Sequence, residues 1–234
     1  MKKIIFVLLS VILITNTVDA QPPKEVEEVI VHAPDKNNPD TYQIFDDKMI
    51  LEGYAKKYHD LPKAILLEMI KDDTLSSYKM AAAVRVLKEK YSTEIVSREK
   101  GLVEKILIRR LNRNDSPFVQ VEIMHTLCRI DRYRYFKSMV PILIQKMDHY
   151  NTTINEIAFH ALEDLISTED NRSREARIVF GTLRNVLFLS RKRLADVKEP
   201  DGKLSQKLKL LRWAIKILGT DVLKALPKEV LNLL

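Results

Sequence analysis

From residue 44 onward, apolar side chains recur every three or four positions, which is the spacing of one face of an α-helix. Strand-like alternation of apolar and polar residues is absent there. Breaks in the pattern fall at regular intervals, and Pro62 and Pro117 stand where prolines of a first helical turn belong. We therefore expect an all-α protein, with helices over residues 44–58, 62–73, 76–91, 97–113, 117–131, 134–148, 152–167, 172–195, 203–219 and 221–234.

Part of this helical pattern repeats along the chain. Residues 119–130 align with residues 154–165, residues 80–87 fit the same frame, and residues 213–218 fit it again after a longer connection. The repeat predicts three equivalent core positions, occupied by Ala83, Ile123, Ala158 and Ala214, by Val84, Met124, Phe159 and Ile215, and by Leu87, Leu127, Leu162 and Leu218. The preceding helices carry their own apolar stripes, namely Ile65, Leu66 and Met69, then Ile106, Ile108 and Leu111, then Val140, Ile142, Leu143 and Met147.

Helix pairs at this spacing resemble HEAT repeats, with residues 141–147 as a first helix and residues 157–162 as a second. The resemblance covers about residues 60–219 as four pairs. The Asp and Arg that often mark such repeats are present only in part, as Asp115 with Gln120, so armadillo-like and other α-solenoid relatives stay open. The resemblance implies a right-handed α-solenoid whose second helices form a concave face that holds a partner without catalysis.

The N-terminal segment has the features of a secretory signal peptide. Lys2 and Lys3 precede an apolar run over residues 4–14, and Val18 and Ala20 are the small residues that signal peptidase requires. The run is about half as long as a membrane-spanning helix. We predict cleavage after Ala20 and export to the periplasm or the medium.

Residues 21–43 differ in composition, because they contain four prolines and carry a net charge of −3. We predict a flexible acidic leader here, followed by a helical domain over residues 44–234. Residues 26–33 within the leader resemble the short energy-coupling box of TonB-dependent transporters, although no β-barrel follows. An edge strand or a disordered tether is the alternative interpretation of the same residues.

Composition excludes several classes of protein. The five glycines are too widely spaced for a phosphate-binding loop, and a single cysteine excludes internal disulfides and cysteine-rich zinc sites. Glu122 and His125 have the spacing of two metal ligands on one helix, and His125 with Cys128 could mimic a base and a nucleophile. Neither pair has the further groups that catalysis needs. We therefore predict no enzyme activity, no metal and no cofactor.

The second helices suggest a binding face. On a helical wheel, the position two residues beyond the first core position points outward, and Arg85, His125, His160 and Lys216 occupy it. Glu122 also faces solvent on this wheel. Stacked pairs would place the four side chains in a basic ladder along the concave face. The first functional hypothesis is therefore an exported, non-catalytic interaction module that binds a protein or peptide.

Charge suggests an alternative function. The chain has a net charge of +7, and residues 172–234 alone carry +9. The second hypothesis is a peripheral envelope protein that docks on anionic lipid through its basic C-terminal helices, whereas nucleic acid is an unlikely partner for an exported protein. Tyr133 and Tyr135 lie among basic residues, where they could stack on bases or lipid headgroups. The candidate residues for an anionic surface are Arg172, Arg174, Arg191, Lys192, Arg193, Lys203, Lys207, Lys209 and Arg212.

Overall fold

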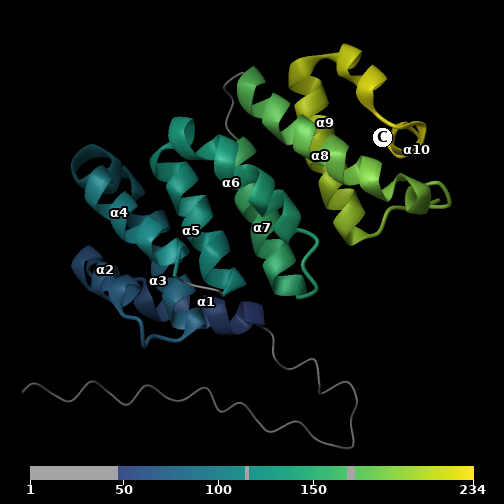
Figure 1. Ribbon diagram of the computed structural model, residues 1–234. Helices are drawn as coiled ribbons and strands as arrows, with labels where there is room; N and C mark the ends of the chain where they lie inside the picture. Colours follow the sequence, from purple (N-terminus) through teal and green to yellow (C-terminus); the bar gives the residue numbers. More distant parts are fainter. Residues whose placement is uncertain (1–46, 114–115, 168–171) are drawn as a thin grey trace, which may run out of the picture. The chain divides into compact units, whose positions relative to one another are not determined.

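The computed structural model describes residues 47–113, 116–167 and 172–234, and within these ranges the secondary structure is helical with no strand (Figure 1). The all-α prediction is confirmed, and the expected helices match the observed ones within a few residues, apart from the junction near residue 95 and the split C-terminal end. The signal peptide, the acidic leader and the segment at residues 26–33 lie outside the described residues. The helices are α1 (Asp47–Tyr58), α2 (Lys63–Lys71), α3 (Ser77–Glu94), α4 (Lys100–Leu111), α5 (Pro117–Ile130), α6 (Arg132–Lys146), α7 (Thr152–Ile166), α8 (Ser173–Leu194), α9 (Gly202–Leu218) and α10 (Lys228–Leu231), with a π-helix η2 (Ile95–Glu99) and a 3₁₀-helix η3 (Thr220–Ala225).

Helix ends follow from local side-chain chemistry. Pro117 occupies the first turn of α5, where a missing N–H costs nothing. Asp131, Asn151 and Asp201 accept hydrogen bonds from backbone N–H groups at the starts of α6, α7 and α9. Gly219 ends α9 with a φ of 89°, a conformation that is strained for other residues.

The junction between α3 and α4 differs from the prediction. We expected a break over residues 92–96, but α3 runs to Glu94 and continues through η2 into α4 without a loop. The reason is that this stretch contains no glycine or proline to end the helix. The change of direction is made instead by the wider π turn and by Glu99, whose backbone (φ −130°, ψ 15°) leaves the helical region.

Buried apolar side chains line every helix from α1 to α9. The first predicted core position is fully buried in all four second helices, while Ile215 and Leu218 of α9 are only half-buried. The stripe predicted for α4 is displaced by one residue, because Val103 and Leu107 are buried and Ile106 and Ile108 are half-buried. Ile65 and Ile142 are exposed, contrary to their place in the predicted stripes of α2 and α6.

Many helices pack against the helix that lies two positions further along the chain. α3 contacts α1 and α5, and α5 also contacts α7, while α2 packs on α4 and α6 packs on α8. Successive helices such as α2 and α3, α6 and α7, and α8 and α9 also pack together. The odd-numbered helices α1, α3, α5 and α7 thus lie in a row, and this row carries the pocket described below (Figure 1).

Candidate functional site

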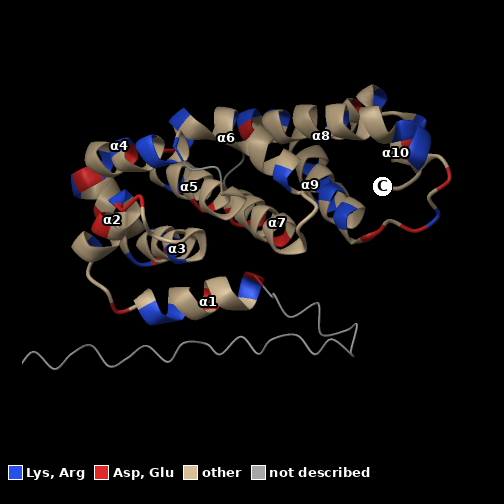
Figure 2. Cartoon of the chain, turned by 60° about the horizontal axis from the view of Figure 1, so that its bottom comes forward, with Lys and Arg blue, Asp and Glu red and all other residues tan. Residues whose placement is uncertain are grey.

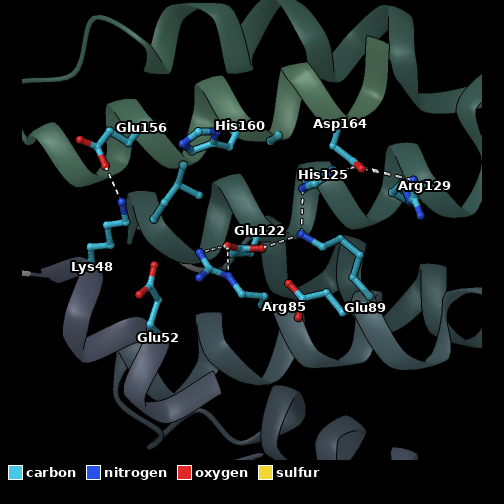
Figure 3. Close-up of a pocket in the computed structure, with 13 residues that line it drawn as sticks. Lys48, Glu52, Arg85, Glu89, Glu122, His125, Arg129, Glu156, His160 and Asp164 are labelled. Carbon is cyan, nitrogen blue, oxygen red and sulfur yellow. Dashed lines mark hydrogen bonds and ion pairs between the residues drawn. The ribbon is translucent and has the colours of Figure 1, made fainter. Parts of the chain in front are cut away.

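A pocket of about 320 Å³ opens on the row of odd-numbered helices. Its lining comes from four helices, and Figure 3 shows these side chains pointing toward a shared space. Charged groups dominate the lining, with both signs present. The lining residues are Lys48 and Glu52 of α1, Arg85, Lys88 and Glu89 of α3, Glu122, His125 and Arg129 of α5, and Glu156, Ile157, His160, Ala161 and Asp164 of α7.

Glu122 is a buried carboxylate at the floor of this pocket, with only 1% of its surface exposed. Arg85 donates to Oε1 from Nε (2.8 Å) and Nη2 (2.6 Å), and Lys88 Nζ donates to Oε2 (3.2 Å). Burial alone would raise the pKa of Glu122, but the charges of Lys88 and Arg85 outweigh burial and lower this pKa to about 2. Glu122 is therefore ionised and neutralised within the protein.

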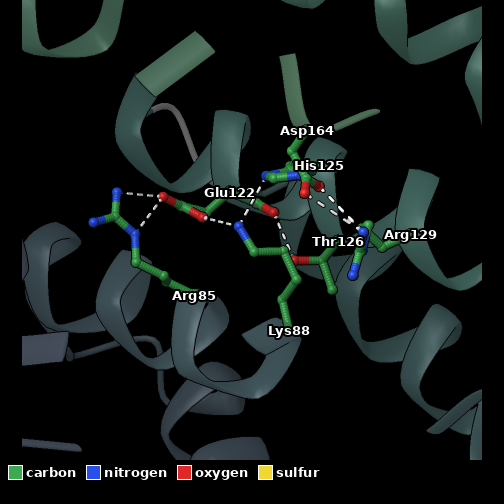
Figure 4. A network of polar contacts seen from close by, with 7 residues as sticks. All are labelled: Arg85, Lys88, Glu122, His125, Thr126, Arg129 and Asp164. Atoms are coloured by element: carbon green, nitrogen blue, oxygen red, sulfur yellow. Dashed lines mark hydrogen bonds and ion pairs between the residues drawn. The ribbon is translucent and has the colours of Figure 1, made fainter. Parts of the chain in front are cut away.

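His125 continues the same network, which Figure 4 shows from close by. Lys88 Nζ lies 2.8 Å from Nδ1, and Asp164 Oδ2 lies 2.7 Å from Nε2. Because a lysine can only donate, Nδ1 must accept from it and Nε2–H must donate to Asp164. Burial and the neighbouring Lys88 lower the pKa of His125 despite Asp164, so the imidazole is neutral.

The structure corrects the predicted outward direction of Glu122 and His125. Both are buried, with His125 only 7% exposed. The physical reason is that α5 packs against α3, α4, α6 and α7, so almost no face of α5 is left for solvent. Arg129 is the one residue of α5 that is exposed.

The structure brings together three of the four residues of the predicted basic ladder. Arg85, His125 and His160 all line the pocket, whereas Lys216 is exposed on α9 and does not line it. Arg85 and His125 point to internal partners, and the exposed His160 lies 3.2 Å from Glu163. Three of the four positions therefore line one pocket, but they do not form a row of available positive charges.

The charge that stays available in the pocket is negative. Lys48 pairs with Glu156 (3.2 Å), and Arg129 pairs with Asp164 (3.4 Å). Glu52 and Glu89 are exposed and have no hydrogen-bond or ion-pair partner among the residues described in the structure. Helix periodicity did not find these two carboxylates, because an exposed acid on a helix is usually only solvated. These two carboxylates stand out only in the structure, where residues of neighbouring helices neutralise the other charged groups of the pocket.

Cys128, which follows His125 by one helical turn, is not exposed to solvent. Cys128 is fully buried, and burial raises the pKa of its thiol to about 12, which keeps it protonated. Within the described ranges, no group of three His, Cys, Asp or Glu side chains has an arrangement that could hold a metal ion.

Many of the predicted anion-binding residues of the C-terminal quarter make internal contacts. Lys207 is buried and pairs with Asp148, Lys209 pairs with Glu163, and Lys203 donates to the carbonyl of His149. Arg172 pairs with Glu175, Arg174 lies over the ring of Tyr133, Arg191 lies over Phe188, and Arg212 donates to the carbonyls of Leu233 and Leu234.

The apolar stripe of α9 packs against the protein core, since Leu208 and Leu211 are buried. These two side chains of α9 are therefore not available to a membrane surface. Lys192 and Arg193 of α8 remain exposed and make no ion pair among the described residues.

Among the described helices, none is both long enough and apolar enough to cross a lipid bilayer. Comparison of the chain with protein-family models, with curated proteins and with solved structures gives no match.

Proposed function

We propose that the helical domain is a non-catalytic interaction module that holds a peptide segment of a partner protein in the pocket between α1, α3, α5 and α7. The observation that carries the proposal is the charge state of this pocket. Its floor is neutralised by internal ion pairs, while Glu52 and Glu89 present carboxylates that have no partner among the described residues. A lysine or arginine of the partner would complement these two groups.

The packing supports a HEAT-like α-solenoid as the architecture of this module. Alternate helices contact each other, and polar contacts recur between residues about one helix pair apart. Arg85 reaches Glu122, Lys88 reaches His125, and His125 reaches Asp164. In such a stack each pair buries its apolar stripe against its neighbours, so a continuous surface is left for a ligand.

Selection from a random peptide library displayed on phage tests the binding proposal. The full domain should select peptides enriched in lysine and arginine. The double variant Glu52→Lys with Glu89→Lys should lose them, because repulsion replaces attraction. The matched control is Asp196→Lys with Glu199→Lys, which makes the same charge change at exposed positions after α8. Equal loss in both double variants, or selection of acidic peptides, would contradict the proposal.

Export is a second part of the proposed function. The positive start, the apolar run and the small residues Val18 and Ala20 support a cleavable signal. N-terminal sequencing of protein recovered outside the cytoplasm of a bacterial host should begin at Gln21. An uncleaved protein retained in the cytoplasm would contradict it.

A further inference from the structure

The basic residues of the domain are divided unequally between two sets of helices. The even-numbered helices α2, α4, α6 and α8 together carry 16 Lys and Arg against 3 Asp and Glu. The helices α1, α3, α5 and α7 carry 8 of each, and α9, which belongs to neither set, carries five basic residues and no acid. Charge counted along the sequence hides this division, because the two sets alternate. Figure 2 marks the basic positions on the ribbon.

The contrast is strongest on α6 and α8, which pack together and carry ten basic residues and one acid. That acid, Glu175, is half-buried and is held by Arg132 (2.8 Å) and Arg172 (3.4 Å). Its charge is therefore neutralised within the protein. The exposed basic residues of the two helices are Arg134, Lys137, Arg174, Arg177, Arg184, Lys192 and Arg193.

On α8 these basic residues share one face. Arg174, Arg177, Arg184 and Lys192 follow one another at helical spacing, opposite the buried Ala176, Val179, Phe180, Leu183 and Leu187. Basic residues therefore recur on the exposed side of α8 from its first turn to its last. Asp196 and Glu199 lie beyond its C-terminal end, in the exposed connection to α9.

Two large apolar side chains interrupt this basic face near the end of α8. Phe188 is 49% exposed and Leu189 is 84% exposed, between Arg184 and Lys192. On α6, Tyr133 is 83% exposed, with the guanidinium of Arg174 5.0 Å from its ring centre. Exposed apolar and aromatic groups set among basic ones are the composition of a helix that lies in a bilayer interface.

We propose that the α6–α8 face (Tyr133, Lys137, Arg174, Arg177, Arg184, Phe188, Leu189, Lys192 and Arg193) docks on the surface of an anionic lipid membrane. The basic side chains attract the headgroups, and Leu189 with Phe188 enters the apolar region below them. Charge alone would equally suit nucleic acid. The exposed leucine and phenylalanine favour lipid, because phosphate backbones offer them no apolar environment.

The face shares Arg174, Lys192 and Arg193 with the docking residues expected from the sequence, but it includes residues of α6 and none of α9. It is also separate from the peptide pocket, whose lining comes from α1, α3, α5 and α7. The two proposals can therefore fail independently.

Vesicle sedimentation tests the docking proposal with the full domain. Phosphatidylcholine vesicles that contain one third phosphatidylglycerol should bind the protein, and vesicles of phosphatidylcholine alone should not. Binding should weaken strongly between about 50 mM and about 500 mM NaCl, since the Debye length falls across this range. A double-stranded RNA of random sequence is the competitor. Displacement by RNA at charge-equivalent concentration would overturn the proposal in favour of nucleic acid.

Three variants locate the surface. Lys192→Glu with Arg193→Glu should weaken vesicle binding at least about twentyfold, because each basic side chain near an anionic surface contributes about fivefold. Leu189→Asn should weaken binding about tenfold and leave its salt dependence unchanged. The matched control, Lys56→Glu with Lys57→Glu, reverses two exposed charges on α1 and should change binding much less. Circular dichroism establishes that all variants remain helical.

An equal loss of binding in the α1 control would show that only net charge matters and would overturn the proposal. A Leu189→Asn variant that binds like the wild type would do so as well. Peptide selection by the Lys192→Glu, Arg193→Glu variant should be unchanged, which separates this surface from the pocket.

Discussion

His125 of α5 bridges Lys88 of α3 and Asp164 of α7 through its two ring nitrogens, at 2.8 Å and 2.7 Å. The bridge fixes one tautomer, because Nδ1 accepts and Nε2–H donates. Together with Glu122 it forms a polar network that joins three helices across the floor of the pocket. This network rigidifies the surface on which a partner would rest.

The first prediction concerns Glu122 and acid. Its pKa is lowered to about 2 in the folded protein, below its ordinary value of 4.5, so the unfolded chain binds more protons between these values. Stability is therefore fully present above pH 4.5 and decreases as the pH falls toward 2, by up to about 3 kcal/mol. Urea denaturation across this range, followed by the fluorescence of Trp213, measures it.

Glu122→Gln should remove this part of the acid dependence and should lower stability at pH 7 by about 3 kcal/mol, because Arg85 and Lys88 lose their counter-ion. Glu199→Gln, at an exposed position after α8, is the matched control and should keep the wild-type profile. A Glu122→Gln profile that parallels the wild type between pH 4.5 and 2 would show that Glu122 titrates normally.

The second prediction compares Arg110 with its neighbour Arg109. Arg110 is buried, pairs with Asp73, and donates from Nη2 to the carbonyl of Asp72 (3.2 Å) and from Nε to Met80 Sδ (2.8 Å). Arg110→Ala should cost about 2 kcal/mol, since the guanidinium is buried and its hydrogen bonds are charge-assisted. Arg109→Ala removes an exposed side chain and should change stability by less than about 0.5 kcal/mol. Thermal denaturation of both variants measures the two losses of stability. Equal losses would show that the contacts of Arg110 do not stabilise the fold.

A third prediction follows from the displaced stripe of α4. Leu107 is fully buried, and Ile106 is half-buried. Leu107→Ala should destabilise the fold by about 2–4 kcal/mol, because it leaves a cavity, and Ile106→Ala by about 1 kcal/mol or less. Chemical denaturation gives both values. A larger loss of stability in Ile106→Ala than in Leu107→Ala would contradict this prediction and would favour the apolar stripe predicted from periodicity.

The reactivity of Cys128 gives the fourth prediction. Its thiol is buried, and burial raises its pKa to about 12, so the thiolate that alkylating agents require is scarce. Iodoacetamide should label the native protein at pH 8 only as fast as the protein unfolds, and labelling in urea should be rapid. Ser97→Cys, at an exposed position on η2, supplies a reactive control. Rapid native labelling at Cys128 itself would contradict its burial.

Helix existence and most core positions could be predicted from the sequence, because an apolar face with helical spacing must be buried against something. The same argument failed for Glu122 and His125. A helical wheel assumes that the side opposite the core is exposed to solvent, whereas other helices pack on nearly every side of α5. Which charges neutralise which, such as Arg85 with Glu122, depends on contacts between helices and is not contained in periodicity.

The concentration of basic residues on the packed helices α6 and α8 was missed for a related reason. Counting along the chain averages neighbouring helices, so it placed the whole excess in residues 172–234. Tyr133 and Lys137 of α6 lie outside that segment, yet they line the same surface pocket as Arg174 of α8. A tertiary arrangement is needed before such residues can be recognised as one surface.

The unbroken path from α3 through η2 into α4 limits where the chain can be lengthened. An inserted residue near Glu94 would rotate α4 by about 100° relative to α3 and move Val103 and Leu107 out of the core. The exposed connection between α8 and α9 imposes no such phase relationship. Evolutionary insertions, and engineered tags or fluorescent labels, should therefore be accepted near residues 196–200 and rejected between residues 94 and 100.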